Sequence, residues 1–133
     1  MASQLFLSTS DSTPMYQQVV DQITAKVVAG DWPPGTALPS IRELASASLV
    51  SVITVKRAYQ ELERAGVIVT RQGKGSFVAD SLDAPRARLR DELDLHIQTL
   101  LTAAGRLGLT RDDLKHLLDS APEPGQDTPQ GPP

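Results

Sequence analysis

Apolar residues recur every three or four positions near the start of the chain, which predicts an amphipathic helix. This helix begins near Pro14, a residue suited to a first helical turn, and it ends at Gly30, before the rigid sequence DWPPG. Trp32 is expected to pack in the core beneath that loop. The buried face of the helix is expected to contain Val19, Val20, Ile23 and Val27.

Two more helices are predicted between residues 40 and 64, with the short sequence LVS as the turn between them. Ser40 and Glu43 match a capping box before the first of these helices, which is about two turns long. Ser51 can cap the second helix, which is expected to run from Val52 to about Arg64. Its buried stripe is predicted to contain Val55, Ala58, Tyr59 and Leu62.

The period of the pattern then changes from helical spacing to alternation. VIVTR at 67–71 and SFVA at 76–79 are typical of short strands, and QGKG between them is typical of a hairpin tip. Three helices followed by a two-stranded hairpin is the order of a winged helix-turn-helix domain. We therefore predict such a domain at residues 13–80, preceded by a flexible segment at 1–12.

A long amphipathic helix is predicted from about Asp83, and the sequence GRLGL ends it. Thr110 and Asp113 resemble a second capping arrangement, at the start of a short last helix. Residues 83–119 thus form a two-helix segment, and residues 120–133, rich in Pro, Gly, Gln and Asp, are expected to be a disordered tail. The fold class is mainly α with a small β-hairpin.

Composition narrows the classes of function. The chain has 133 residues, no cysteine, no apolar run of the length of a membrane span and no secretory signal pattern, so we expect a cytoplasmic protein without disulfides or thiolate chemistry. The net charge is −3, but residues 40–77 hold six basic and three acidic residues. From residue 82 onward six basic residues face nine acidic ones. The basic middle modestly favours a nucleic-acid partner.

The start of the helix at 52–64 has the residue types of a DNA recognition helix, whose first residues reach base edges in the major groove. Ser51, Ile53, Thr54 and Lys56 would face the groove, because the opposite face is the buried stripe. Lys56 can meet guanine edges or phosphates, and so can Arg57.

Two neighbouring elements add basic side chains. Arg42 lies in the first turn of the preceding helix, beside the expected groove mouth. In the hairpin tip, Gly73 and Gly75 permit positive φ angles on either side of Lys74, which would probe a minor groove or a phosphate, and Arg71 stands at the base of the tip. The two glycines could equally serve only to make a tight turn.

Three motifs, LPSIRELA, TVKRAYQELERAGVI and RQGKGSFV, resemble in order and spacing the DNA-binding domain of the GntR family of bacterial transcription regulators, from about Pro14 to Val78. AYQELE and the short C-terminal part look most like the YtrA-type subfamily. The resemblance implies a repressor that acts on its own operon and on a neighbouring transporter operon. It also implies contacts to double-stranded DNA by Arg42, Ser51, Thr54, Lys56, Arg57 and Gly75.

The chain departs from the family pattern at three positions. Val52 and Ile53 replace residues that are often Arg, Asn or another polar residue, and neither can hydrogen-bond a base, so they can only touch a thymine methyl group. Leu49 occupies a turn position where glycine is common, and the turn is therefore expected to adopt another geometry.

The two C-terminal helices are too small to enclose a pocket for a small molecule, so we expect no cofactor and leave any effector unknown. A monomer would expose their apolar face, which indicates a homodimer on a palindromic operator. The predicted interface contains Leu89, Leu93, Ile97, Leu100, Leu101, Leu114, Leu117 and Leu118. His96 and His116 lack a clear third ligand, so no metal site is expected.

Two other classes of function compete with this interpretation. A winged helix can serve as a protein–protein module without an operator, with Val52 and Ile53 as its apolar contact. Another branch of the family resembles this domain fused to a pyridoxal-phosphate aminotransferase-like domain, but the chain ends at residue 133 and contains no nucleophile–base pair, so we expect no enzyme. The operator, the regulated genes and the sign of regulation are not indicated.

Overall fold

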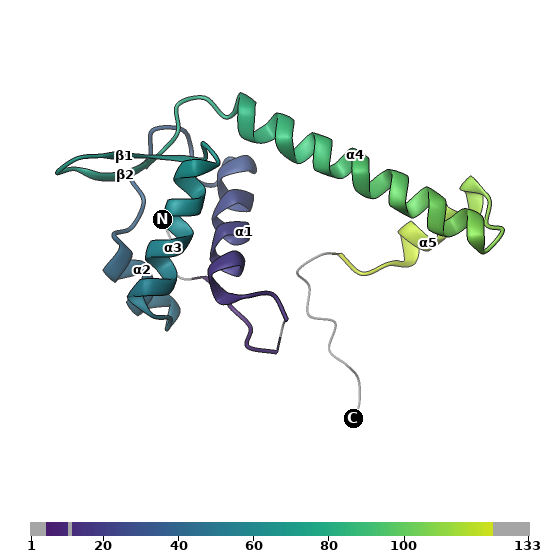
Figure 1. Cartoon of the computed structure of the whole chain (residues 1–133), viewed down its shortest axis with the longest axis horizontal. Coiled ribbons are helices and arrows are strands. Elements are labelled where there is room, and N and C mark those ends of the chain that lie inside the picture. The colour runs from purple at the N-terminus through teal and green to yellow at the C-terminus, as the bar shows by residue number, and fades with distance from the viewer. Residues whose placement is uncertain (1–4, 11, 124–133) are drawn as a thin grey trace. The chain divides into compact units, whose positions relative to one another are not determined.

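The computed structural model describes residues 5–10 and 12–123. Its element order confirms the predicted mainly α fold with one antiparallel hairpin (Figure 1). The chain divides into two compact units, one up to Leu89 and one from Arg90. The elements are α1 (Met15–Val28), α2 (Ile41–Ser48), α3 (Val52–Arg64), β1 (Ile68–Arg71), β2 (Gly75–Val78), α4 (Asp83–Arg106) and α5 (Arg111–Ser120).

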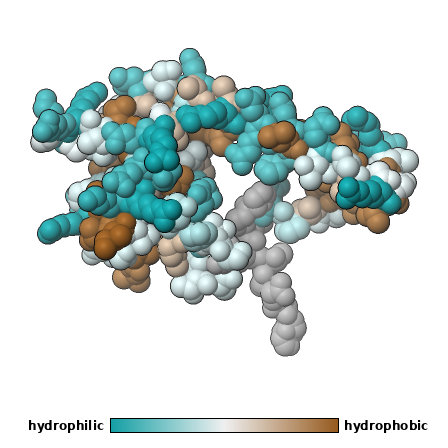
Figure 2. Space-filling model, in the orientation of Figure 1, coloured by the Kyte–Doolittle hydropathy of each residue, from teal (hydrophilic) through white to brown (hydrophobic). Residues whose placement is uncertain are grey.

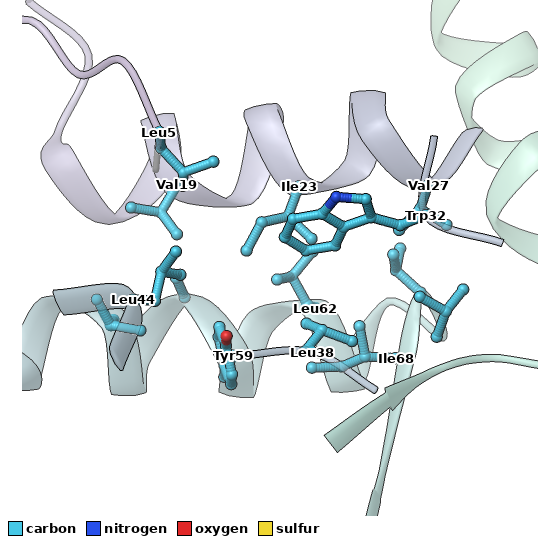
Figure 3. Close-up of a cluster of buried hydrophobic side chains, with 14 of the residues drawn as sticks. Leu5, Val19, Ile23, Val27, Trp32, Leu38, Leu44, Tyr59, Leu62 and Ile68 are labelled. Atoms are coloured by element: carbon cyan, nitrogen blue, oxygen red, sulfur yellow. The ribbon is translucent and has the colours of Figure 1, made fainter. Parts of the chain in front are cut away.

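The core of the first unit lies between α1, α3 and the hairpin, and Figure 3 shows its largest side chains. The helical spacing seen in the sequence predicts the buried stripes well, since Val19, Ile23 and Val27 of α1 are fully covered and all four stripe residues of α3 are buried. Trp32 is buried in the same cluster, as expected. This core fixes α3 against α1 and leaves the opposite face of α3 to solvent.

The helix ends of the helix-turn-helix follow the predicted caps. The Ser40 Oγ accepts a hydrogen bond from the Glu43 N–H at 3.1 Å, which supplies the serine half of the predicted box. The Ser51 Oγ accepts one from the Thr54 N–H, also at 3.1 Å, at the start of α3. These bonds satisfy amide groups that have no partner inside the first turn of a helix.

The turn between α2 and α3 corrects one prediction. We expected a geometry other than the one glycine favours, yet Leu49 has φ 59° and ψ 43°, which is the left-handed conformation. The Val50 N–H donates to the Ala45 carbonyl at 3.1 Å, a bond that closes the turn. Packing of the two helices therefore imposes the usual turn on a residue that tolerates it poorly.

The hairpin pairs Ile68 with Val78 and Arg71 with Gly75. A further segment lies along the free edge of β2, where the Leu38 N–H donates to the Ser76 carbonyl at 2.8 Å and the Val78 N–H donates to the Thr36 carbonyl at 2.8 Å. The loop before α2 thus completes the wing as a third, short edge, which the sequence did not indicate.

Residues 5–10 belong to the segment predicted to be flexible, and several of them contact the first unit. Leu5 is buried in the core, and its N–H donates to the Ser48 Oγ at 3.1 Å. The Gln18 side chain accepts from the Ser8 N–H at 2.9 Å and donates to the Ser8 carbonyl at 2.8 Å. Glutamines on α1 hold this segment in place, a long-range contact that composition alone does not reveal. Residues 1–4 and 11 lie outside the described residues.

The first turns of α4 pack with the first unit. The Arg86 guanidinium donates to the Val28 carbonyl at 2.7 Å, at the end of α1, and the Arg88 guanidinium donates to the Ala65 carbonyl, at the end of α3. Leu82 and Pro85 are buried beside them. Two arginines thus cap the C-terminal ends of two helices, where cations are favourable.

The second unit contains the rest of α4 and α5, and Ala104 and Leu114 are buried in it. The predicted cap of α5 is a complete capping box, in which the Thr110 N–H donates to the Asp113 carboxylate at 2.9 Å and the Asp113 N–H donates to the Thr110 Oγ1 at 3.1 Å. The bonds from Thr110 lower the pKa of Asp113. Within residues 5–10 and 12–123, no helix is long and apolar enough to cross a membrane.

Candidate nucleic-acid interface

The first turn of α3 presents an apolar surface. Ile53 is 79% exposed and Val52 is 47% exposed. The Ser51 and Thr54 hydroxyls lie 2.8 Å apart and hydrogen-bond each other, while Ser51 also caps the helix. Figure 2 shows apolar side chains at the surface among hydrophilic ones in the region of α2 and α3. The hydroxyls that the sequence offered for DNA contact are thus engaged with each other.

Exposed basic side chains lie near this apolar turn. Lys56 lies one turn further along α3 and is exposed, and Arg42 is exposed in the first turn of α2. Both side chains are therefore accessible to an anionic partner. The solvent-facing side of α3 therefore has an apolar first turn followed by an exposed basic residue.

Arg57 makes a contact with α1 that the sequence did not indicate. Its guanidinium lies over the ring of Tyr16, 3.7 Å from the ring centroid, in cation–π geometry. Tyr16 is in the first turn of α1, so the stack connects α1 and α3. Sequence reasoning missed Tyr16, because nothing in the spacing links positions 41 residues apart. The stack keeps Arg57 exposed but restrains it on the α1 side of α3.

The wing places a single lysine at its tip. Lys74 is exposed, and its N–H donates to the Arg71 carbonyl at 2.9 Å. Gly73 has φ 76° and Gly75 has φ 106°, so the positive φ angles expected from the sequence occur on both sides of Lys74. The Arg71 guanidinium lies 4.8 Å from the centroid of the Phe77 ring, across the hairpin. Arg71 thus supports the wing while its charge stays near the surface.

Tyr59 ties the recognition helix to the loop before α2. Its hydroxyl donates to the Pro39 carbonyl at 2.7 Å. Burial, and to a lesser degree the Glu43 carboxylate, raises the pKa of the Tyr59 phenol far above its ordinary value. The phenol is therefore a neutral donor at any physiological pH, and it fixes where the first turn of α2 lies relative to α3.

The residues predicted for a dimer interface have unequal exposure. Leu114 is buried within the chain and Leu101 is half-buried. The others are exposed, namely Leu89, Leu93, Ile97, Leu100, Leu117 and Leu118. Leu89, Leu93, Ile97 and Leu100 are spaced three or four residues apart on α4, so they form one apolar row on that helix.

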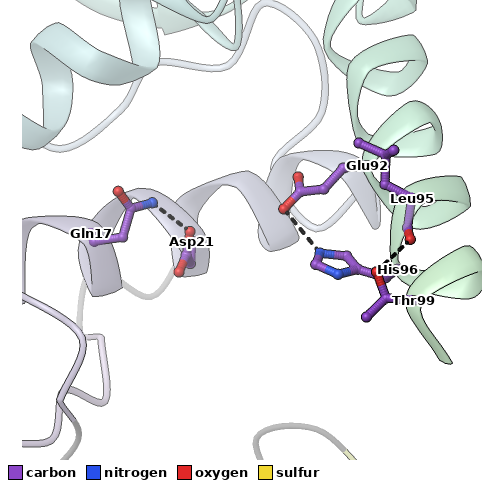
Figure 4. Close-up of polar contacts among 6 residues, drawn as sticks. All are labelled: Gln17, Asp21, Glu92, Leu95, His96 and Thr99. Carbon is purple, nitrogen blue, oxygen red and sulfur yellow. Dashed lines mark hydrogen bonds and ion pairs between the residues drawn. The ribbon is translucent and has the colours of Figure 1, made fainter. Parts of the chain in front are cut away.

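The two histidines are engaged locally. The His96 Nε2 lies 3.6 Å from the Glu92 carboxylate, one turn earlier on α4, and Figure 4 shows this pair beside the bond from Thr99 to the Leu95 carbonyl. The His116 Nδ1 lies 2.7 Å from the Asp112 carbonyl. In the described part of the chain, no three His, Cys, Asp or Glu side chains are grouped as metal ligands would be.

Comparison with known proteins identifies a family and several relatives. The pattern of the bacterial regulatory proteins of the gntR family matches residues 15–78. The chain is similar to the uncharacterized HTH-type transcriptional regulator YhcF of Bacillus subtilis, with 36% identity over 77% of this chain and 85% of the relative. It is also similar to the HTH-type transcriptional repressor YtrA of the same organism, with 41% identity over 53% of this chain and 54% of the relative.

Solved structures extend the comparison. YtrA from Sulfolobus acidocaldarius, a GntR-family transcription factor, superimposes with a TM-score of 0.63 at 34% identity, over 73% of this chain and 96% of that one. The DNA-binding domain of AraR in complex with operator ORX1 superimposes with a TM-score of 0.52 at 31% identity, over 57% of this chain and 96% of that one. The chain therefore belongs to the gntR family of bacterial DNA-binding transcription regulators, and it is similar to the YtrA proteins of that family.

Proposed function

We propose that the protein is a homodimeric repressor that binds a palindromic operator through α3 and the wing. The observation that carries this proposal is the position of exposed basic side chains, Lys56 on α3 and Lys74 at the wing tip, on a core-supported helix-turn-helix. A helix supported in this way can enter a major groove while the wing follows the backbone. A location in the cytoplasm, with the DNA, follows from this function.

The proposed DNA contacts are of two kinds, those that recognise bases and those that position the protein on the DNA backbone. Lys56 is assigned to base edges or to a phosphate inside the groove, with Arg42, Ser51 and Thr54 beside it. Lys74, Arg71 and Gly75 are assigned to the DNA backbone near the wing, and Arg57 is assigned to a phosphate on the α1 side of α3, because it stacks on Tyr16. The complex of the AraR DNA-binding domain with its operator supports DNA binding by this type of domain.

The apolar row on α4 supports a dimer. Leu93, Ile97 and Leu100 lie exposed on the second unit, and a second copy can cover them in an isologous contact. Two such chains would present two recognition helices to two half-sites related by a two-fold axis. The proposed target is the promoter of the chain's own operon together with a neighbouring transporter operon.

The test selects bound fragments from sheared genomic DNA and then titrates the best fragment at several salt concentrations. We expect a palindromic site whose association constant falls linearly with salt on logarithmic scales. Lys56→Ala should relax the preference for that site by about 1–3 kcal/mol. Transcription in vitro from a promoter that contains the site should fall when the protein is added. Weak, uniform binding to all fragments would contradict the proposal.

A further inference from the structure

The first turn of α3 has exposed methyl groups where a recognition helix needs contacts to bases. Val52 and Ile53 are the first two residues of the helix, and both are exposed. Ser51 accepts the Thr54 N–H and shares a hydrogen bond with the Thr54 hydroxyl, so the polar atoms of this turn already serve the cap. What the turn offers to a partner is mostly aliphatic surface.

The chemistry of the major groove limits what such a surface can recognise. Each base pair presents donors and acceptors there, and only thymine adds an apolar group, its 5-methyl. Aliphatic side chains against a purine edge would displace water from polar atoms and offer no hydrogen bond in return. Against a thymine methyl, the same side chains bury apolar surface on both partners.

We propose that Val52 and Ile53 read thymine methyl groups, so that each operator half-site holds thymines opposite the first turn of α3. This inference rests on the proposed function, since it requires α3 to enter the major groove. It assigns specificity to two residues that carry no polar atom. Basic contacts then come from Lys56, one turn later, and from Arg42 on α2.

The two kinds of contact are separable by experiment. Deoxyuridine differs from thymidine only by the missing methyl group, so its effect reports the apolar contact alone. Losing one buried methyl corresponds to about a fourfold loss of affinity. When the same change is made in both half-sites, the loss should be about fifteenfold.

The test uses the full chain and the operator obtained by selection, with thymines replaced one at a time by deoxyuridine. We expect one or two positions in each half-site to be sensitive. Ile53→Ala should lower the affinity for thymine DNA and make thymine and uracil equivalent at one of these positions, and Val52→Ala should do so at another. When cytosine replaces thymine at one of these positions, a 5-methyl group on that cytosine should restore part of the lost affinity.

Lys56→Ala is the matched control, because it removes a charge from the same helix but no methyl contact. It should lower the affinity while leaving the ratio between thymine and uracil DNA unchanged. Both apolar residues are exposed, so their alanine variants should melt at the temperature of the original protein.

Two results would overturn the inference and leave the proposed function intact. One is a specific operator in which no deoxyuridine substitution changes the affinity. The other is a thymine preference that survives both Val52→Ala and Ile53→Ala. If no specific DNA site exists and the apolar turn instead binds a protein, the inference and the proposed function both fail.

Discussion

Leu49 lies in the turn between α2 and α3 with a left-handed backbone, which costs an L-residue other than glycine about 1–2 kcal/mol. Its side chain is 90% exposed, so it contributes little packing in return. Leu49→Gly should therefore raise the free energy of unfolding by about 1 kcal/mol, after allowance for the greater freedom of glycine in the unfolded chain. Urea denaturation measures this change.

Leu49→Ala is the control for that prediction. It removes the same exposed side chain but keeps a Cβ atom, so it should bring no comparable gain. Equal stability of the glycine and alanine variants would show that the turn stores no backbone strain.

Tyr59 permits a second prediction at this scale. Tyr59→Phe removes the hydrogen bond to the Pro39 carbonyl and should lower the free energy of unfolding by about 1 kcal/mol. The folded state raises the pKa of this phenol, so it keeps the proton to higher pH than the unfolded chain does. The stability that this phenol contributes is therefore present below pH about 10 and is lost as pH rises above that value.

Urea titrations at pH 8 and at about pH 10.5 test both parts. The original protein should lose more stability between the two pH values than Tyr59→Phe does. Tyr16→Phe, which keeps the ring that stacks under Arg57, should retain the alkaline dependence of the original. An identical dependence in the Tyr59 variant would contradict the assignment.

Among single residues, those predicted correctly are the ones whose cause is local. Ser40, Ser51 and Thr110 cap helices because a hydroxyl and an amide three residues apart meet in any helix start. The prediction for the turn at Leu49 was wrong because the backbone conformation of this residue is not set locally. The packing of α2 on α3 outweighs the backbone preference of one residue.

At the scale of elements, the wing has a clear electrostatic expectation. Lys74→Ala should weaken binding to all DNA sequences alike, since a phosphate contact carries no sequence information. The slope of log K against log salt should become less steep by about one for each protomer bound. Anisotropy titrations on the operator and on unrelated DNA, at four salt concentrations, measure both effects.

Gln72→Ala provides the matched control, because Gln72 is exposed in the same tip and carries no charge. It should leave the slope unchanged. Arg71→Ala should also weaken all sequences, and it should in addition loosen the hairpin, because it removes the stack on Phe77. A Lys74→Ala slope identical to that of the original would exclude a phosphate contact at the wing tip.

Element bounds followed closely from the sequence, while contacts between elements did not. The change of period near residue 67 located the hairpin, and α3 has the predicted limits. The bonds of Arg86 to Val28 and of Leu5 to Ser48 join residues 58 and 43 positions apart. Periodicity shows which face of an element is buried but not which partner covers it, so such contacts need the fold.

At the scale of the whole molecule, the proposed function requires a second copy of the chain. The chain is acidic overall and basic in its middle, so one chain alone would bind DNA weakly and with little selectivity. In a dimer, binding of the second chain to its half-site becomes intramolecular, which can raise the affinity by about 10²–10⁴-fold. The exposed row on α4 is the feature that can join the two chains.

Ile97→Glu tests that role. Ile97 is 41% exposed and lies in the row with Leu93 and Leu100, so a second copy would bury the new carboxylate without a partner. Light scattering at micromolar concentration should then give the mass of one chain for the variant and twice that mass for the original. Operator affinity should fall by about 10²-fold or more, as the link between half-sites is lost.

Leu95→Glu places the same charge on the same helix. Leu95 is exposed, and helical spacing puts it on the side of α4 opposite the row. It should leave both the dimer mass and the operator affinity unchanged, so the comparison separates the position of the charge from its mere presence. If both variants remain dimers with the original affinity, the row on α4 is not the contact between protomers, and another surface must bring the two recognition helices together.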